Sequence, residues 1–168
     1  MRRKLLSIAG SAIFLVIAPG VVAGWVPWWI SRWSFQTPFA GMALLRVAGG
    51  ILIALGAIGL LDSFVRFAVQ GLGTPAPVLP TRHLVVTGLY RYVRNPMYLA
   101  VASTILGQGM LFGNVTLIEY GAFVWLLFHA FVIAYEEPTL LATFGPEYEA
   151  FRAGVRRWIP RLTPWSGR

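Results

Sequence analysis

The chain has 168 residues, of which 57% are hydrophobic and only 12% are charged, and its mean hydropathy is +0.68. A soluble domain carries roughly 25% charged residues, so the composition predicts an integral membrane protein, with residues 1–168 forming a single domain. The net charge of +8 could indicate nucleic-acid binding, and the chain contains no cysteine. The basic residues lie at the ends of apolar segments, which is typical of membrane topology and lipid headgroup contact rather than of nucleic-acid binding. Cysteine-based metal sites and disulfides are excluded, and two distant histidines predict no metal site.

Apolar runs predict an all-α membrane fold of about four transmembrane helices, with a split or re-entrant segment as an alternative fifth. The predicted spans are residues 5–24, 42–69, 97–112 and 115–135. The first span is also similar to a signal peptide, because three basic residues precede it and small residues end it. The last two spans are joined at Gly113-Asn114, which predicts a tight turn. Residues 1–70 would form an N-terminal helix pair and residues 71–168 the cofactor-binding core.

Basic residues are distributed unequally between the two predicted membrane faces. One face carries Arg2, Arg3, Lys4, Arg66, Arg82, Arg91, Arg94, Arg152, Arg156, Arg157, Arg161 and Arg168. The other carries only Arg32 and Arg46. Positive residues remain preferentially in the cytoplasm, so the asymmetry predicts that both termini and the loop at residues 70–95 are cytoplasmic. The expected location is a bacterial or archaeal cell membrane.

Two patterns within the second span predict local contacts. Asp62 and Arg66 are four residues apart and should form an ion pair at the cytoplasmic end of the helix. Gly50, Ala54 and Ala57 recur at helical spacing, and such small residues predict close packing against another helix.

Two polar clusters flank the hairpin formed by the third and fourth spans. The basic and aromatic stretch at residues 88–98 directly precedes the third span, and Glu136-Glu137 directly follows the fourth. A hairpin would bring both clusters to one membrane face, where charged groups are costly to desolvate and therefore indicate a site. His129 lies about two turns before Glu136 on the same predicted helix. It could face this site or be a packed histidine bonded to a neighbouring helix.

A last helix is predicted to begin at Gly145-Pro146. Tyr148, Phe151 and Val155 would form an apolar stripe on it, with arginines on either side. We expect this amphipathic helix to lie on the cytoplasmic membrane surface and to cap the site.

Four motifs in this half of the chain resemble the isoprenylcysteine carboxyl methyltransferase family. They are Arg-x-Pro-x-Tyr at residues 94–98, Glu-Glu at 136–137, Phe-Gly-x-x-Tyr at 144–148 and Val-x-Arg-x-x-Pro at 155–160. Related patterns occur in integral-membrane phospholipid N-methyltransferases. The resemblance covers roughly residues 73–160. It implies a multi-helix membrane enzyme that transfers a methyl group from S-adenosyl-L-methionine, leaving S-adenosyl-L-homocysteine, to a lipophilic or prenylcysteine-like acceptor at the cytoplasmic face.

The resemblance also implies which residues bind the cofactor and which face the acceptor. The cofactor-binding candidates are His83, Leu84, Val85, Val86, Tyr90, Arg94, Asn95, Pro96, Met97, Tyr98, Glu136 and Glu137. The cofactor carries a carboxylate, an ammonium and a sulfonium, which are groups that arginine, carboxylates and aromatic rings bind respectively. The acceptor-side candidates are Arg152, Arg156, Arg157 and His129. No catalytic residue is assigned, because an in-line displacement onto a carboxylate needs no strong acid or base.

This sequence departs from the family pattern at two positions. Asn95 stands where the family commonly has histidine, and Val132 stands where the eukaryotic prenylcysteine enzymes have an arginine that meets the substrate carboxylate. The second departure argues against a free prenylcysteine carboxylate unless a tail arginine replaces that contact. Two alternative functions also remain at this stage: an NADPH-dependent reductase similar to the sterol reductases, and a non-enzymatic membrane subunit.

Overall fold

The structure is a computed structural model that describes residues 17–38, 41–66 and 84–167. All regular elements in these ranges are helical, as expected for an all-α membrane protein. The longer helices are α2 (Val26–Ser31), α3 (Met42–Arg66), α4 (Pro96–Phe112), α5 (Val115–Phe131), α6 (Glu137–Phe144) and α7 (Pro146–Gly154). Two π-helical turns, Val21–Trp25 and Val132–Glu136, and a 3₁₀ turn at Gly88–Arg91 complete the set.

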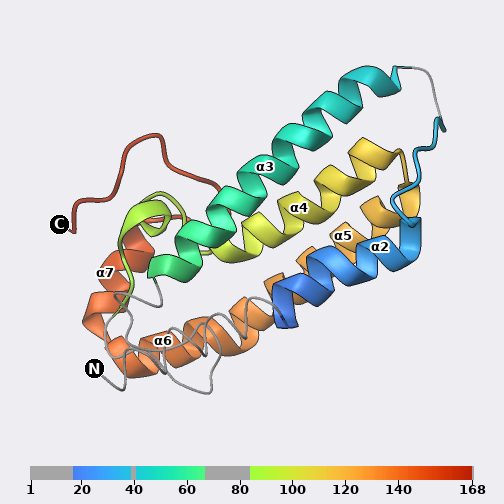
Figure 1. Cartoon of the computed structure of the whole chain (residues 1–168). Coiled ribbons are helices and arrows are strands. Elements are labelled where there is room, and N and C mark those ends of the chain that lie inside the picture. Colours follow the sequence, from blue (N-terminus) through green and yellow to red (C-terminus); the bar gives the residue numbers. More distant parts are fainter. Residues whose placement is uncertain (1–16, 39–40, 67–83, 168) are drawn as a thin grey trace, which may run out of the picture.

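Helix α4 lies at the centre of the bundle and packs against α3 on one side and α5 on the other (Figure 1). The α3–α4 contact is close because glycines meet there. A Cβ on Gly49 would lie 2.6 Å from the carbonyl oxygen of Gly107, and a Cβ on Gly107 would lie 2.7 Å from the carbonyl oxygen of Gly49. Small residues allow helix backbones to approach in this way.

The sequence prediction for this packing face was wrong. Ala54 and Ala57 are exposed, and nothing lies within 4 Å of the place where a Cβ on Gly50 would be. The buried small residues of α3 are instead Gly49, Gly56, Gly59 and Ser63. Both sets have helical spacing, and α3 is apolar on all sides, so its sequence does not single out one face.

The turn between α4 and α5 has the predicted form. Gly113 ends α4 with a left-handed φ of 69°, a conformation that glycine adopts without steric penalty. Asn114 begins α5, and its side chain accepts a hydrogen bond from the Leu117 amide at 3.0 Å. This N-cap satisfies one of the free amides of the first turn, so α4 and α5 form the expected hairpin.

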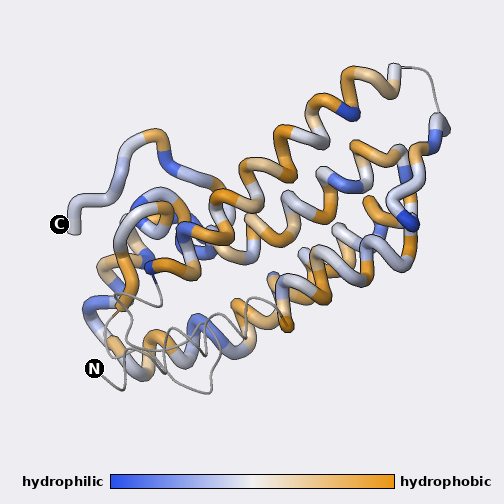
Figure 2. The backbone as a smooth tube through the Cα atoms, viewed as in Figure 1, coloured by the Kyte–Doolittle hydropathy of each residue, from blue (hydrophilic) through white to orange (hydrophobic). Residues whose placement is uncertain are grey.

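Two helical segments are long and apolar enough to cross a membrane: Met42–Arg66, and Val115–Phe144, which joins α5, the π-helical turn and α6. Helix α4 is apolar but shorter. Apolar residues predominate along these helices, whereas hydrophilic residues gather at the end of the bundle beside α7 (Figure 2). The helix predicted to end near residue 135 continues to Phe144. The helix predicted to end near residue 24 continues to Ser31, and the part of that span before residue 17 lies outside the described residues.

Each π-helical turn is followed by a proline two residues after its end. Proline has no amide hydrogen, and its ring clashes with the carbonyl four residues earlier. In this chain a wider π-helical turn relieves that clash. In the first turn Pro27 leaves two carbonyls free of their helical donors, and side chains from other helices replace them. Gln108 donates to the Ala23 oxygen at 2.7 Å and Tyr120 donates to the Val22 oxygen at 3.0 Å.

Helix α7 has the predicted apolar stripe, but this stripe faces protein. Tyr148, Phe151 and Val155 are 2%, 3% and 1% exposed. They pack against the segment before the 3₁₀ turn, the end of α6 and the C-terminal tail, namely Leu84, Val86, Leu140, Leu141, Phe144 and Trp165. The stripe therefore contacts other parts of the chain rather than lipid. The expectation that α7 lies on the membrane surface stays a prediction.

Candidate functional site

The segment that leads into α4 is fixed against the end of α3. Arg66 forms the predicted ion pair with Asp62, at 2.7 Å, and its guanidinium lies against Gly88, where any side chain would overlap it. Gly88 also has a φ of +55°, which favours glycine. Tyr90 is 7% exposed; burial raises the pKa of its phenol, and a hydrogen bond with Ser63 acts in the opposite direction.

Tyr98 and Glu136 meet across the α4–α5 hairpin. The Tyr98 hydroxyl donates to a carboxylate oxygen of Glu136 at 2.6 Å. The Tyr98 ring packs on Phe128 with ring centroids 4.8 Å apart. The two motifs that the sequence placed on one membrane face are thus in direct contact.

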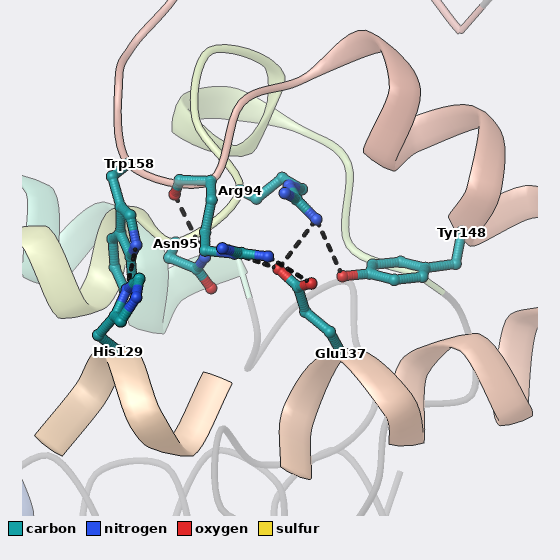
Figure 3. Close-up of polar contacts among 7 residues, drawn as sticks. Arg94, Asn95, His129, Glu137, Tyr148 and Trp158 are labelled. Atoms are coloured by element: carbon teal, nitrogen blue, oxygen red, sulfur yellow. Dashed lines mark hydrogen bonds and ion pairs between the residues drawn. The ribbon is translucent and has the colours of Figure 1, made fainter. Parts of the chain in front are cut away.

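Glu137 is the centre of a second cluster (Figure 3). Arg157 donates to both of its carboxylate oxygens, at 2.6 and 2.9 Å, and Arg94 lies 3.0 Å from one of them. The side chains of Glu137 and Arg94 are only 11% and 10% exposed. Arg94 also donates to the Tyr148 hydroxyl at 3.3 Å. Ionised partners raise the strength of such bonds, so this cluster joins the loop before α4 to α6, α7 and the tail.

Two pKa values outside the helical spans follow from this cluster. Burial raises the pKa of the Tyr148 phenol, and the Glu137 carboxylate acts in the same direction. The hydrogen bond with Glu137 raises the pKa of the Arg157 guanidinium. Tyr148 therefore stays neutral and Arg157 stays charged at ordinary pH.

Neighbouring residues on a helix point about 100° apart, which explains why Glu136 and Glu137 have different partners. Glu137 faces two guanidinium groups, whereas no described cationic side chain forms an ion pair with Glu136. A partly buried carboxylate without a cation is costly. Glu136 is therefore suited to binding a positively charged group that none of the described side chains supplies.

The C-terminal tail runs beside the loop that precedes α4. The amides of Arg94, Arg161 and Trp165 donate to the carbonyls of Arg156, Tyr92 and Arg91, at 3.0, 2.9 and 2.9 Å. The side chain of Asn95 donates to the Arg157 carbonyl at 3.2 Å. The side-chain amide of Asn95 thus binds the backbone of the tail.

His129 binds the same tail rather than a neighbouring helix. Trp158 donates from its indole nitrogen to Nδ1 of His129 at 2.9 Å (Figure 3). The His129 ring also stacks on Trp125, with centroids 5.2 Å apart. Because the indole is a donor only, a neutral His129 carries its hydrogen on Nε2.

The structure brings several of the predicted site residues into contact, in separate groups. Tyr98 contacts Glu136. Arg94 and Arg157 contact Glu137, and Asn95 bonds the Arg157 carbonyl. Leu84 and Val86 pack on the α7 cluster. Val85, Tyr90 and Pro96 are buried and Met97 is partly buried. Arg152 and Arg156 are exposed, and His83 lies outside the described residues.

Three contacts of the site were not predicted: Arg157 with Glu137, Trp158 with His129, and Arg94 with Tyr148. They come from the tail and from α7, and no sequence periodicity identifies partners in an irregular segment. Val132, at the position where an arginine would be expected, is 1% exposed. The described residues contain no group of three or more metal-ligating side chains.

Comparisons with known proteins agree with the motifs. Residues 44–147 match the family of phospholipid methyltransferases, a match that spans more than half of the chain. A curated relative, the protein-S-isoprenylcysteine O-methyltransferase of Schizosaccharomyces pombe, is 39% identical over 82 residues, which are 48% of this chain and 34% of the relative. The chain therefore matches about a third of that relative's length. The predicted resemblance is confirmed.

Proposed function

Because the chain belongs to the phospholipid methyltransferase family, we propose that it transfers a methyl group from S-adenosylmethionine to a lipophilic acceptor at the edge of the membrane. The observation that carries this proposal is the contrast between the two adjacent carboxylates. Glu137 is neutralised by Arg94 and Arg157, whereas Glu136 contacts the Tyr98 hydroxyl. A cationic ligand would supply the positive charge that no described side chain places beside Glu136.

The described residues fit the polar groups of S-adenosylmethionine. Glu136 would hold the ammonium group. Nε of Arg94 is buried and has no hydrogen-bond partner among the described residues, so an acceptor such as a carboxylate would satisfy a donor that is otherwise costly to bury. The Tyr98 ring, whose hydroxyl bonds Glu136, packs on Phe128, and aromatic faces attract a sulfonium.

The chemistry supplied by the cofactor is an activated methyl group on sulfur, which an acceptor atom attacks in line. The protein's part is to position the reactants and to exclude water. Glu137 holds Arg94 and Arg157 in place, and the hydrogen bond from Tyr98 orients Glu136. The tail closes over the loop before α4 through backbone hydrogen bonds, which keeps solvent from that side.

The acceptor would carry a hydrocarbon tail, because the site lies where apolar helices end. Val132 is buried and Arg157 is bonded to Glu137. Arg152 and Arg156 are therefore the exposed tail arginines that could contact an anionic group of the acceptor. The name of the fungal relative and the name of the family suggest prenylcysteines and phospholipids as the first acceptors to assay.

Calorimetry on the detergent-solubilised protein tests the cofactor site. We expect Glu136→Gln to weaken S-adenosylhomocysteine binding roughly ten- to hundredfold, because a hydrogen bond to a charged group contributes about 1.5–3 kcal/mol. Glu149→Gln is the matched control, since Glu149 is exposed on α7, and it should leave the affinity unchanged. In an assay with cofactor labelled in its methyl group, the label should be recovered in lipid-extractable material.

Two results would contradict the proposal. One is equal affinity in wild type and Glu136→Gln, which would remove Glu136 from the site. The other is stabilisation of the protein by NADPH but not by S-adenosylhomocysteine, which would favour a reductase.

A further inference from the structure

Two aliphatic side chains near the C-terminus are exposed on a short loop. Ile159 is 61% exposed and Leu162 is 101% exposed. They belong to residues 156–162, which we call the tail loop. The apolar stripe of α7 is buried against protein. Ile159 and Leu162 are therefore large apolar side chains that remain exposed near the C-terminus.

The tail loop is held in its shape at both ends. The Arg94 amide donates to the Arg156 carbonyl before the loop, and the Arg161 amide donates to the Tyr92 carbonyl near its end. Pro160 lies between these points and restricts its own φ and the residue before it. Ile159 and Leu162 cannot turn inward unless these backbone bonds break.

A side-chain contact places the loop beside a membrane-spanning helix. Trp158 bonds to His129 and packs beside Trp125 on α5. His129 lies seven residues before Glu136, about 10 Å along the helix. On the same stretch of α5, Leu126 and Leu127 are 58% and 53% exposed. Ile159, which follows Trp158, therefore lies near the level at which α5 presents aliphatic side chains.

Cationic side chains precede the aliphatic pair. Arg152 and Arg156 are exposed, and among the described residues neither side chain has an ion pair or hydrogen bond. Long basic side chains near apolar surface place their charge at the headgroups while their stems stay in hydrocarbon. Basic residues at a membrane surface attract anionic lipids.

We propose that the tail loop is a lipid-binding element. Ile159 and Leu162 insert among the acyl chains of the leaflet at this end of the helices, and Arg152 and Arg156 bind the phosphates of anionic lipids. This interaction surface includes no contact of Glu136, although Arg152 and Arg156 are the same arginines that could meet an anionic group of the acceptor. Its test requires no enzymatic activity.

Site-directed spin labelling tests the proposal, because the chain has no cysteine and each label needs only one substitution. Ile159→Cys and Leu162→Cys carry the probes, and Ser166→Cys, an exposed polar position in the same tail, is the matched control. The measured quantity is the ratio of the label's collision rate with oxygen to its collision rate with a water-soluble nickel chelate. In nanodiscs containing anionic lipid, this ratio should be severalfold greater at 159 and 162 than at 166. Combining Leu162→Cys with Arg152→Gln and Arg156→Gln should lower this ratio toward its value in zwitterionic nanodiscs.

Leu162 is fully exposed, so its substitution removes no packing and the fold is preserved in that variant. A water-like ratio at 162 in both kinds of nanodisc would overturn the proposal. Shielding of the label from oxygen and nickel alike would indicate a protein partner on this loop and would overturn it as well. An unchanged ratio in the arginine variant would overturn the proposal that Arg152 and Arg156 bind anionic lipid.

Discussion

At the scale of single residues, the two adjacent glutamates differ in what surrounds them. Glu137 is 9% exposed and lies between two guanidinium groups, whereas Glu136 lies at the end of the α4–α5 hairpin with Tyr98. A buried carboxylate that compensates a buried arginine contributes to stability through its partner. The two positions should therefore respond differently to the same substitution.

We expect Glu137→Gln to lower the free energy of unfolding by about 3 kcal/mol, because Arg94 is then left buried without its carboxylate. Thermal unfolding in detergent measures this change. Glu147→Gln, at an exposed position on α7, serves as the control and should differ little from wild type. Equal stability of the two variants would show that the Arg94–Glu137–Arg157 cluster is not formed.

The contact between Tyr98 and Glu136 could be predicted because a tight turn at Gly113-Asn114 forces the ends of two helices to one side. The ion pair of Asp62 and Arg66 could be predicted because residues four apart on a helix are neighbours. The partners of Glu137 could not. Arg157 is twenty residues away in a segment without helical or strand periodicity, so only the folded chain reveals the pair.

At the scale of the elements, the α3–α4 interface depends on which glycines face inward. Gly49 and Gly50 are adjacent, yet a Cβ on Gly49 would lie 2.6 Å from the Leu111 amide nitrogen and a Cβ on Gly50 would meet nothing within 4 Å. Backbone atoms cannot move aside as a flexible side chain can, so the two positions differ in what they tolerate.

Gly49→Ala should lower the free energy of unfolding by about 1–3 kcal/mol through overpacking. Gly50→Ala should leave it unchanged or raise it by up to about 1 kcal/mol, because alanine favours the helix. Thermal unfolding of the pair in one detergent tests the register of α3 on α4. The opposite order of stability would indicate that α3 packs through the face formed by Gly50, Ala54 and Ala57.

Helix existence could be predicted from apolar runs, but three features of the elements could not. The face of α3 was wrong by one residue, because the helix is apolar all round. The π-helical turns were not predicted, although Pro27 and Pro138 are visible in the sequence, because a proline alone does not distinguish a kink from a wider turn. The extension of the last long helix to Phe144 passes through such a proline.

At the scale of the whole molecule, the basic residues of the described chain gather at the end that carries the candidate site. Arg66, which pairs with Asp62, and Arg94 and Arg157, which pair with Glu137, lie at that end. Arg46 lies near the opposite end of α3, where it donates to the Gln36 carbonyl at 3.1 Å. This distribution supports the proposal that the site end of the molecule is cytoplasmic.

Compartment reporters test this orientation. A reporter fused after residue 168 should be cytoplasmic, and one inserted at Ser34, near the opposite end of the bundle, should be on the other side of the membrane. A reporter at Lys4 should agree with the one at the C-terminus. An external C-terminus would separate the site from cytoplasmic S-adenosylmethionine and would also contradict the proposed reaction.

The hydrogen bonds that the Val22 and Ala23 carbonyls accept from other helices have a consequence for biogenesis. Their donors, Gln108 and Tyr120, are synthesised more than eighty residues later. Until the α4–α5 hairpin arrives, the first helix would hold two unpaired carbonyls, which are costly in a bilayer. We therefore expect the nascent N-terminal helix to remain in a hydrated or chaperoned environment and to settle into lipid only once the translocon has released that hairpin.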